Sequence, residues 1–303
     1  MQRDVKKIES FFSKERFEKM RQHSAIVFDV DDTLLERRKN VHENDQVFSE
    51  SSAAMSLIRL LELGVRVCLI TGHGWTQLED RLVKPLIKEL LQTFPDSYRK
   101  LATRFFVYAN RGATKIIWQG EQFKEDENHG KRFAFNDSDL DKINKVFSEL
   151  NGIFCKDFAK KEILYRQRFE EFNFNELPPK IIGREKVVLG LRPIPSEWHS
   201  KRKSSDSPRQ KLFEKGMKLL KENGLDGKYD LSQSGKSTLE ITRKSVSKEI
   251  AFSDIIETIA KENRISTKQV EESSIYIGDE FFVGGNDFII AERFPKTLCI
   301  SVS

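Results

Sequence analysis

The chain has 303 residues, which at roughly 150 residues per domain is enough for two domains or for one large core with an insertion. Apolar residues make up 38% of the sequence and charged residues 33%. With 23 phenylalanines the chain can bury a sizeable core, so disorder over most of its length is excluded. The net charge of +5 is mild for this length and does not by itself indicate nucleic-acid binding.

The N-terminal residues, the apolar runs and the cysteines bear on the compartment in which the protein is expected. The N-terminal residues lack the apolar stretch of a signal peptide, and no run approaches the roughly 18 apolar residues that span a bilayer. Cys68, Cys155 and Cys299 are far apart and lack metal-finger spacing. We therefore expect a protein without a membrane span in a reduced, cytoplasmic environment.

Residues 2–22 are charged, with apolar residues at rough helical spacing. This pattern predicts an amphipathic helix packed on the edge of a domain. A helix that binds a membrane surface or a partner is the alternative.

Strands and helices alternate in the first part of the chain. Residues 25–30 form a short apolar run, typical of a strand buried on both faces of a parallel sheet. The elements predicted next are a helix at about 50–63 closed by Gly64, a strand over 65–70, a helix over 75–94, a strand over 104–109, and a strand or hairpin arm over 114–118. This order indicates an α/β fold with a doubly wound, Rossmann-like parallel sheet.

The pattern changes at about residue 120 and returns after about 235. The intervening segment is richer in charge and phenylalanine, with predicted helices at about 138–150 and 208–222, a strand over 186–191, and a polar, basic loop over 201–209. Strands over 238–242, 274–277 and 296–302 and helices over 247–262 and 266–272 follow. We predict a discontinuous core of residues 1–119 and 236–303, interrupted by an inserted α+β domain of residues 120–235.

The strongest chemical signal is a pair of carboxylates at the carboxyl end of the first strand. Asp29 ends the strand and Asp31 lies in the turn after it. Ligands bind at this edge of open α/β sheets, and carboxylates beside a buried strand need a cation or a proton to share. Mg²⁺ is the hard cation that prefers oxygen ligands. A turn that only caps the next helix is the alternative.

Three further segments carry polar residues that could bind phosphate or a metal ion. A hydroxyl with loop N–H groups suits a phosphate oxygen, a lysine neutralises phosphate charge, and a Gly-Asp after a strand repeats the arrangement at Asp29. Each alone has a plain structural explanation, such as an ordinary turn or a surface lysine. The residues are Thr71 and Gly72, Lys248, and Asp279 with Asn286 and Asp287.

Together these segments resemble the four motifs of the haloacid dehalogenase superfamily of phosphotransferases. The large insertion between the second and third motifs is similar to the branch that holds Cof-type sugar phosphatases, sucrose- and trehalose-phosphate phosphatases, and phosphomannomutases. The resemblance covers about 24–118 and 236–303. The insert is matched only by position and size.

The resemblance implies a role for each motif residue. Asp29 would be the nucleophile that forms an aspartyl-phosphate, and Asp31 would protonate the leaving oxygen and then activate water. Thr71 would hold a phosphate oxygen, and Lys248 would hold Asp29 and the phosphoryl group. The residues implied to contact substrate are Thr33, Gly72, Asn110 and Arg111. Those implied to bind or support Mg²⁺ are Asp29, Asp31 through its backbone carbonyl, Asp279, Asn286 and Asp287.

Three positions depart from the common pattern. Asp32 stands where the family usually has glycine, and aspartate tolerates turn geometry. His73 stands where arginine is frequent, which leaves that substrate contact open. Lys244 competes with Lys248 for the third motif, and we favour Lys248 because it begins a predicted helix.

The function implied is that of a Mg²⁺-dependent phosphatase acting on a small phosphorylated metabolite, in particular a sugar phosphate. The insert would act as a cap that closes over the site and selects the substrate. A phosphomannomutase-like mutase is one alternative, and a binding protein on a retained scaffold is the other. No nucleic-acid partner is expected, and the sequence predicts no oligomeric state.

Overall fold

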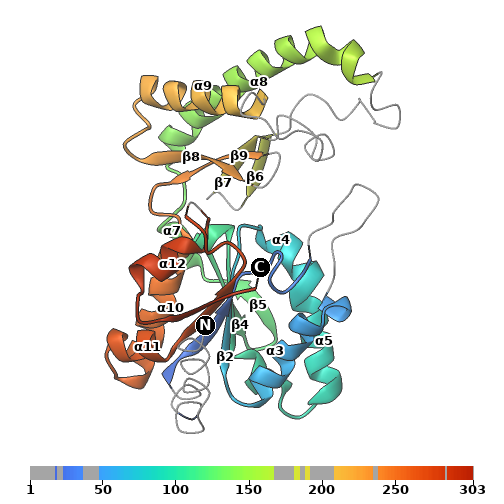
Figure 1. The fold of residues 1–303 in the computed structure, drawn as a ribbon, viewed down its shortest axis with the longest axis vertical. Helices are drawn as coiled ribbons and strands as arrows, with labels where there is room; N and C mark the ends of the chain where they lie inside the picture. Colours follow the sequence, from blue (N-terminus) through green and yellow to red (C-terminus); the bar gives the residue numbers. More distant parts are fainter. Residues whose placement is uncertain are drawn as a thin grey trace. The chain divides into compact units, whose positions relative to one another are not determined.

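The computed structural model describes residues 18, 23–36, 48–166, 181–184, 188–191, 208–234, 238–283 and 285–302. The chain divides into two compact units, Met1–Gly130 with Val246–Ser303, and Lys131–Ser245 (Figure 1). Most of the predicted helix 2–22 and of the basic loop 201–209 lies outside the described residues. In the part of the chain that is described, no helix is long and apolar enough to cross a membrane.

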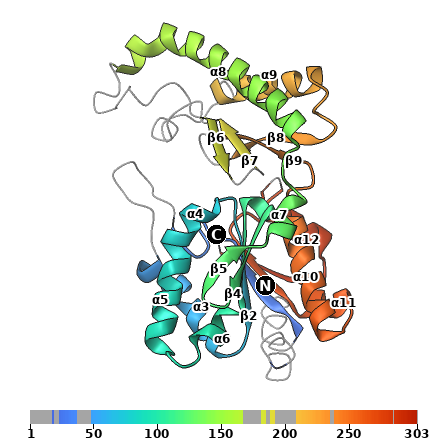
Figure 2. The ribbon, with the colours of Figure 1, turned by 180° about the vertical axis from the view of Figure 1, so that it is seen from behind.

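A seven-stranded sheet forms the centre of the first unit, in the order β11-β10-β1-β2-β3-β4-β5 (Figures 1 and 2). Its strands are β1 (Ala25–Phe28), β2 (Arg66–Ile70), β3 (Phe105–Ala109), β4 (Thr114–Gln119), β5 (Gln122–Glu125), β10 (Ile275–Gly278) and β11 (Leu298–Ser301). The pairs from β11 to β3 are parallel, whereas β4 and β5 add an antiparallel edge.

Helices cover both faces of this sheet (Figure 2). On one face lie the short helix η1 (Phe48–Glu50), α3 (Ser52–Glu62), α4 (Trp75–Leu78), the π-helical segment η2 (Glu79–Val83), α5 (Lys84–Thr93) and α6 (Tyr98–Ala102). On the other lie α10 (Lys248–Asn263), α11 (Thr267–Ser273) and α12 (Phe288–Arg293). The short segments η3 (Asn110–Gly112) and α7 (Glu127–Lys131) follow β3 and β5. The doubly wound, Rossmann-like α/β prediction is thereby confirmed.

Strand β1 shows why its sequence is a continuous apolar run. Side chains of successive residues in a strand point to opposite faces of the sheet. Ile26 and Phe28 pack with the helices of the α3 face, whereas Ala25 and Val27 pack with α10. All four residues are buried, because a parallel strand between two helical layers has no face in water.

The second unit is an α+β structure, as expected of the insert. Its antiparallel sheet has the order β6-β7-β9-β8, with strands β6 (Ile181–Arg184), β7 (Val188–Leu191), β8 (Tyr229–Ser234) and β9 (Thr238–Arg243). Its helices are α8 (Asp137–Arg166) and α9 (Pro208–Glu222). Phe147 and Leu150 of α8 share a buried core with Leu219 of α9 and Ile241 of β9.

The observed elements differ from the predicted ones in a few places. The sequence analysis missed β5, β6, β8, α6, α7 and α12, all of which are short apart from β8. The predicted helix 138–150 continues to Arg166, and the predicted helix 75–94 is divided by the π-helical segment η2.

The junctions between the two units also lie later than the predicted boundaries at 119/120 and 235/236. Strand β5 pairs with β4 and so belongs to the core, whereas β9 pairs with β8 and belongs to the insert. Strand pairing determines to which unit each strand belongs. The sequence does not reveal this pairing, because a short polar strand such as β5 gives little sequence signal.

Candidate active site

The carboxyl ends of β1, β2 and β10 meet at one edge of the core sheet. Phe28 of β1 is in register with Leu69 of β2 and with Ile277 of β10. Asp29 follows directly, and its backbone N–H donates to the carbonyl oxygen of Ile277 at 2.9 Å. Thr71 likewise comes directly after β2. This shared edge brings together segments that are far apart in the sequence.

Lys248, at the start of α10, is buried between two of the acidic residues. Its Nζ lies 3.0 Å from Asp29 Oδ1 and 2.7 Å from Asp287 Oδ1. The competing residue Lys244 is exposed and lies in the second unit. The lysine beside Asp29 is therefore Lys248.

Three carboxylates gather at this point. Asp29, Asp279 and Asp287 each offer an oxygen, and these oxygens lie within 4.8 Å of one another. Oxygens bound to one Mg²⁺ or Ca²⁺ at about 2.0–2.6 Å lie at most about 4–5 Å apart, so the cluster fits a single hard divalent cation. Three carboxylates also carry more negative charge than Lys248 alone balances. The donor set and its charge both favour a cation here, without distinguishing Mg²⁺ from Ca²⁺.

Asp287 is held in place by several groups besides Lys248. The hydroxyl of Tyr276 donates to Asp287 Oδ1 at 2.6 Å, and the backbone N–H of Glu280 donates to Oδ2 at 3.1 Å. A Cβ at Gly278 would lie 2.5 Å from Asp287 Oδ2. The close approach of Asp287 to β10 therefore requires glycine at position 278.

The protonation of this cluster follows from its burial. Burial raises the pKa of Asp29 from 3.8 to about 7, against the lowering effect of Lys248. Burial lowers the pKa of Lys248, but the charges of Asp29 and Asp287 outweigh it, so that its pKa is raised and it keeps its proton. Burial and the nearby carboxylates also raise the pKa of Tyr276 well above its ordinary value, so its hydroxyl remains a donor. A bound cation would favour the ionised form of Asp29.

The side chain of Asp31 contacts residues of the segment after β2. One of its oxygens is 2.5 Å from His73 Nε2, and the other is 3.7 Å from a guanidinium nitrogen of Arg81. His73 Nδ1 in turn contacts Gln77 Oε1 at 2.7 Å. Asp32 has a φ of +56°, the left-handed conformation for which glycine is the usual residue. Asp31 thus faces His73 and Arg81, two side chains from the segment after β2.

Thr71 lies in a turn that contacts a second loop. Its Oγ1 accepts a hydrogen bond from the backbone N–H of His73 at 3.1 Å. The backbone N–H of Arg111 donates to Thr71 O, and that of Asn110 donates to His73 O, both at 2.8 Å. The side chain of Asn110 is fully buried and donates to Thr114 Oγ1 at 3.0 Å. The motif turn and the loop after β3 are thus one hydrogen-bonded assembly.

The structure brings four of the predicted residues together: Lys248 contacts Asp29 and Asp287, and an oxygen of Asp279 lies within 4.8 Å of both carboxylates. Asn286 is exposed, and its backbone N–H donates to Glu280 Oε2 at 3.2 Å. Thr33 Oγ1 is buried and makes no hydrogen bond within the described residues. Gly72 and Arg111 are partly exposed. For the other predicted substrate contacts, the roles implied by the resemblance remain predictions.

Sequence reasoning missed two residues at the site. Tyr276 reads as one more apolar position of β10, and only its hydroxyl could have suggested a polar partner at the end of the strand. Arg81 lies in η2, inside what the sequence presents as a continuous helix. π-Helical segments often occur at functional sites, but their position has no simple sequence signal.

The fold itself is found in other solved structures. The chain resembles the IMP-nucleotidase of Plasmodium falciparum, with a TM-score of 0.59, 18% identity, and coverage of 95% of this chain and 67% of that one. Its ATP-bound form gives a TM-score of 0.60 and 19% identity, and the chain spans 60% of its length. A trehalose-6-phosphate phosphatase of Aspergillus fumigatus aligns with a TM-score of 0.48, 13% identity, and coverage of 96% and 88%.

These similarities define the class of the fold. The chain has the haloacid dehalogenase-type fold, with three aspartates, two of them buried and Asp279 partly exposed, at the carboxyl edge of its sheet. No family model and no curated protein sequence matches the chain.

Proposed function

We propose that the chain is a Mg²⁺-dependent phosphatase that hydrolyses a small phosphate monoester through an aspartyl-phosphate on Asp29. The observation that carries this proposal is the contact of Asp29 with Lys248 beside the carboxylates of Asp279 and Asp287. Phosphoryl transfer needs positioning and charge stabilisation more than elaborate covalent chemistry, and this cluster supplies both.

Asp29 is the proposed nucleophile. One of its oxygens attacks the phosphorus, the bond to the leaving oxygen breaks, and the phosphoryl group stays on Asp29 as an acyl phosphate. Lys248 orients the Asp29 carboxylate at 3.0 Å and keeps a positive charge beside the phosphoryl oxygens. The divalent cation, when bound by the Asp29, Asp279 and Asp287 carboxylates, supplies further neutralisation of the phosphate charge.

Asp31 is the proposed general acid and base. It protonates the leaving alcohol in the first step and takes a proton from the attacking water in the second. Asp31 contacts His73 and Arg81, whereas Asp29 contacts Lys248. The two aspartates therefore have different surroundings, as different roles require.

The substrate is proposed to be a sugar phosphate or a nucleoside monophosphate. The sequence motifs resemble a branch with sugar phosphatases. The solved structure that aligns with a TM-score of 0.60 is instead a nucleotidase, from Plasmodium falciparum. Thr71 and the loop after β3 would contact the phosphate. It stays a prediction that the inserted unit helps to select the substrate.

The test is phosphate release from a panel of sugar phosphates and nucleoside monophosphates, with Mg²⁺, with Ca²⁺ and with EDTA. We expect release from one or a few compounds with Mg²⁺ and loss of release with EDTA. Phosphate that is moved within a sugar instead of released would identify a mutase. No turnover of any compound, with or without a bisphosphate activator, would contradict the proposal.

Asp29→Asn provides the mechanistic control. The two side chains are nearly the same in size, and we expect a loss of at least about a thousandfold in kcat without unfolding. Asp32→Asn makes the same chemical change at an exposed position whose left-handed backbone suits asparagine, and it should keep near-normal turnover. Normal turnover in Asp29→Asn would contradict the proposed nucleophile.

A further inference from the structure

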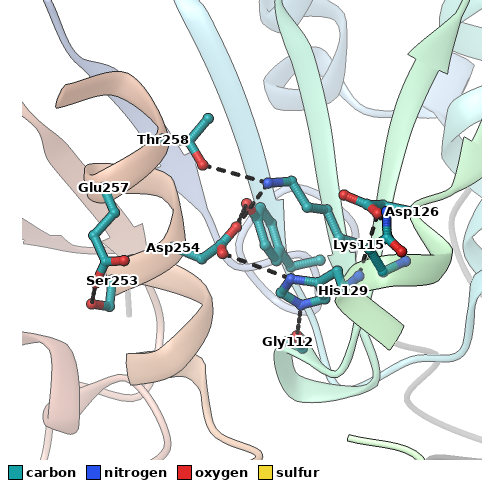
Figure 3. A network of polar contacts seen from close by, with 10 residues as sticks. Gly112, Lys115, Asp126, His129, Ser253, Asp254, Glu257 and Thr258 are labelled. Atoms are coloured by element: carbon teal, nitrogen blue, oxygen red, sulfur yellow. Dashed lines mark hydrogen bonds and ion pairs between the residues drawn. The ribbon is translucent and has the colours of Figure 1, made fainter. Parts of the chain in front are cut away.

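A partly buried polar network lies on the α10 face of the core (Figure 3). At its centre Asp254 of α10 accepts hydrogen bonds from the Tyr108 hydroxyl at 2.7 Å and from Lys115 Nζ at 2.8 Å. His129 of α7 places its Nδ1 3.7 Å from Asp254 Oδ1. The four residues come from β3, β4, α7 and α10, so the network joins two paired strands of the sheet to α7 and α10.

The ionisation of the network is fixed by its surroundings. Burial tends to raise the pKa of Asp254, but its interactions with His129, Lys115 and Tyr108 outweigh it and hold this pKa well below its ordinary value. Burial and the charge of Asp254 raise the pKa of Tyr108 well above its ordinary value. Asp254 is therefore a carboxylate that only accepts hydrogen bonds, and Tyr108 is a donor to it.

The second nitrogen of His129 reaches a backbone group of the loop after β3. His129 Nε2 lies 2.8 Å from the carbonyl oxygen of Gly112, and both groups are buried. A carbonyl oxygen can only accept, so Nε2 carries the hydrogen. Figure 3 shows the ring of His129 between Asp254 and Gly112. His129 thus links α10 to the loop Asn110–Gly112.

This loop has a backbone conformation that needs outside support. Asn110 and Arg111 have φ values of +51° and +58°, and Gly112 has a φ of +100°. Such conformations are unfavourable for residues with side chains and persist only where the surroundings enforce them. A Cβ at Gly112 would lie 2.7 Å from the Cβ of Ala251 in α10. The loop is therefore pressed against the helix that begins with Lys248.

The same loop holds the turn of the second motif. The backbone N–H groups of Arg111 and Asn110 donate to Thr71 O and His73 O. A continuous path of polar contacts therefore runs from Asp254 through His129 and the loop to the proposed phosphate-binding turn. Its two ends lie on the two elements, α10 and the segment after β2, that carry Lys248 and Thr71.

We propose that His129 and Asp254 are positioning residues that hold the loop Asn110–Gly112 against α10 and thereby fix the Thr71–His73 turn for the substrate phosphate. This inference rests on the proposed phosphatase function. Neither residue is proposed to touch the substrate. Their effect passes through the bond from His129 to Gly112 O and through the two backbone bonds from the loop to the turn.

The second unit contains a matched control network. There Asp139 accepts from the Tyr229 hydroxyl at 2.9 Å and from Lys228 Nζ at 3.0 Å. The carboxylate, phenol and ammonium groups are the same as around Asp254, but no backbone carbonyl of a motif loop is attached. Asp139→Asn therefore measures what the loss of such a network does to stability alone.

The experiment compares His129→Leu, His129→Gln and Asp254→Asn with Asp139→Asn. Three quantities are measured for each folded variant: kcat and KM for the substrate found in the panel, the Kd of inorganic phosphate by calorimetry, and the hydrogen exchange of the Asn110 and Arg111 amides. Glutamine can still donate to Gly112 O, so it should restore part of what leucine loses. If His129→Leu does not fold, Asp254→Asn and His129→Gln give the same comparison.

We expect His129→Leu and Asp254→Asn to lower kcat/KM by about tenfold to a hundredfold and to weaken phosphate binding. The Asn110 and Arg111 amides should exchange faster in both variants, and Asp139→Asn should leave all three quantities unchanged. Wild-type KM, phosphate affinity and amide exchange in the His129 and Asp254 variants would overturn the inference. A wild-type protein without any turnover would overturn the proposed function instead, and the amide exchange would still test the coupling.

Discussion

Lys248 Nζ lies 3.0 Å from Asp29 Oδ1, although the two residues belong to the third and first sequence motifs and an entire inserted unit separates them along the chain. The contact depends on α10 beginning at the carboxyl edge of the sheet, where β1 ends. Both side chains are almost fully buried, so little solvent screens the charges that they carry.

Lys248→Ala should therefore lower kcat much more than Lys244→Ala. Loss of Lys248 leaves Asp29 and Asp287 without their shared cation, and removal of one preorganised charge from such a site costs about 10²–10³ in kcat. Lys244 is exposed, and its replacement should change kcat by less than about twofold. Steady-state kinetics of the two variants decide the matter. A larger loss in Lys244→Ala would contradict the assignment of the third motif.

Asp29→Asn should stabilise the metal-free protein, in a way that depends on pH. The pKa of Asp29 is raised by burial from 3.8 to about 7, so the folded state binds a proton that the unfolded state has lost between these pH values. Wild-type stability therefore falls as the pH rises from about 4 to about 7, and the difference from Asp29→Asn is constant above this range. Thermal unfolding in EDTA should show the variant melting a few degrees higher at pH 8.

At pH 4 and below, the same two proteins should melt at nearly equal temperatures. Added Mg²⁺ should raise the Tm of the wild type more than that of Asp29→Asn, because the variant offers one carboxylate fewer. A variant less stable than the wild type at pH 8 in EDTA would show that burial of the Asp29 charge is fully offset by Lys248.

Tyr276→Phe should weaken the binding of Mg²⁺ without removing activity. The Tyr276 hydroxyl donates to Asp287 at 2.6 Å, and loss of a partner that orients a metal ligand typically costs about 10–100-fold in metal affinity. The measurement is the Mg²⁺ concentration that gives half-maximal turnover. Tyr229→Phe removes a hydroxyl that donates to Asp139 in the second unit and serves as the control. Equal Mg²⁺ requirements in both variants would argue against a metal site at Asp287.

Gly278→Ala should abolish most activity while Gly227→Ala keeps it. A Cβ at Gly278 would lie 2.5 Å from Asp287 Oδ2, so Asp287 must move away from Lys248. Gly227 has open space around its Cβ position. We expect a loss of about a hundredfold or more in kcat/KM for the first variant, because small displacements at such sites have large effects. Normal turnover of Gly278→Ala would mean that Asp287 has no part in the reaction.

The α/β class and the alternation of strands and helices along the chain follow from residue patterns in the sequence. Continuous apolar runs such as Ala25–Phe28 are typical of strands that are buried on both faces, and their alternation with amphipathic segments predicts parallel pairing. Because parallel strands end at one edge, the sequence also predicted that Asp29, Asp279 and Asp287 would be neighbours. These predictions use local patterns and one general rule of topology.

Elements without such patterns could not be predicted. Strand β5 is short and mostly polar, and its place in the core depends on pairing with β4. The π-helical segment that carries Arg81 toward Asp31 looks like ordinary helix in the sequence. In both cases long-range contacts determine the local structure, so a window of neighbouring residues does not contain the information.

The sequence by itself determined the residue types of the site and the positions along the chain of the strands that carry them. Only the tertiary structure decided that Lys248 and not Lys244 lies beside Asp29, that Tyr276 holds Asp287, and that His129 links α10 to the loop at Gly112. The physical reason is that side-chain contacts depend on helix and strand placement to within about an ångström. That placement results from the packing of the whole core, which no single segment specifies.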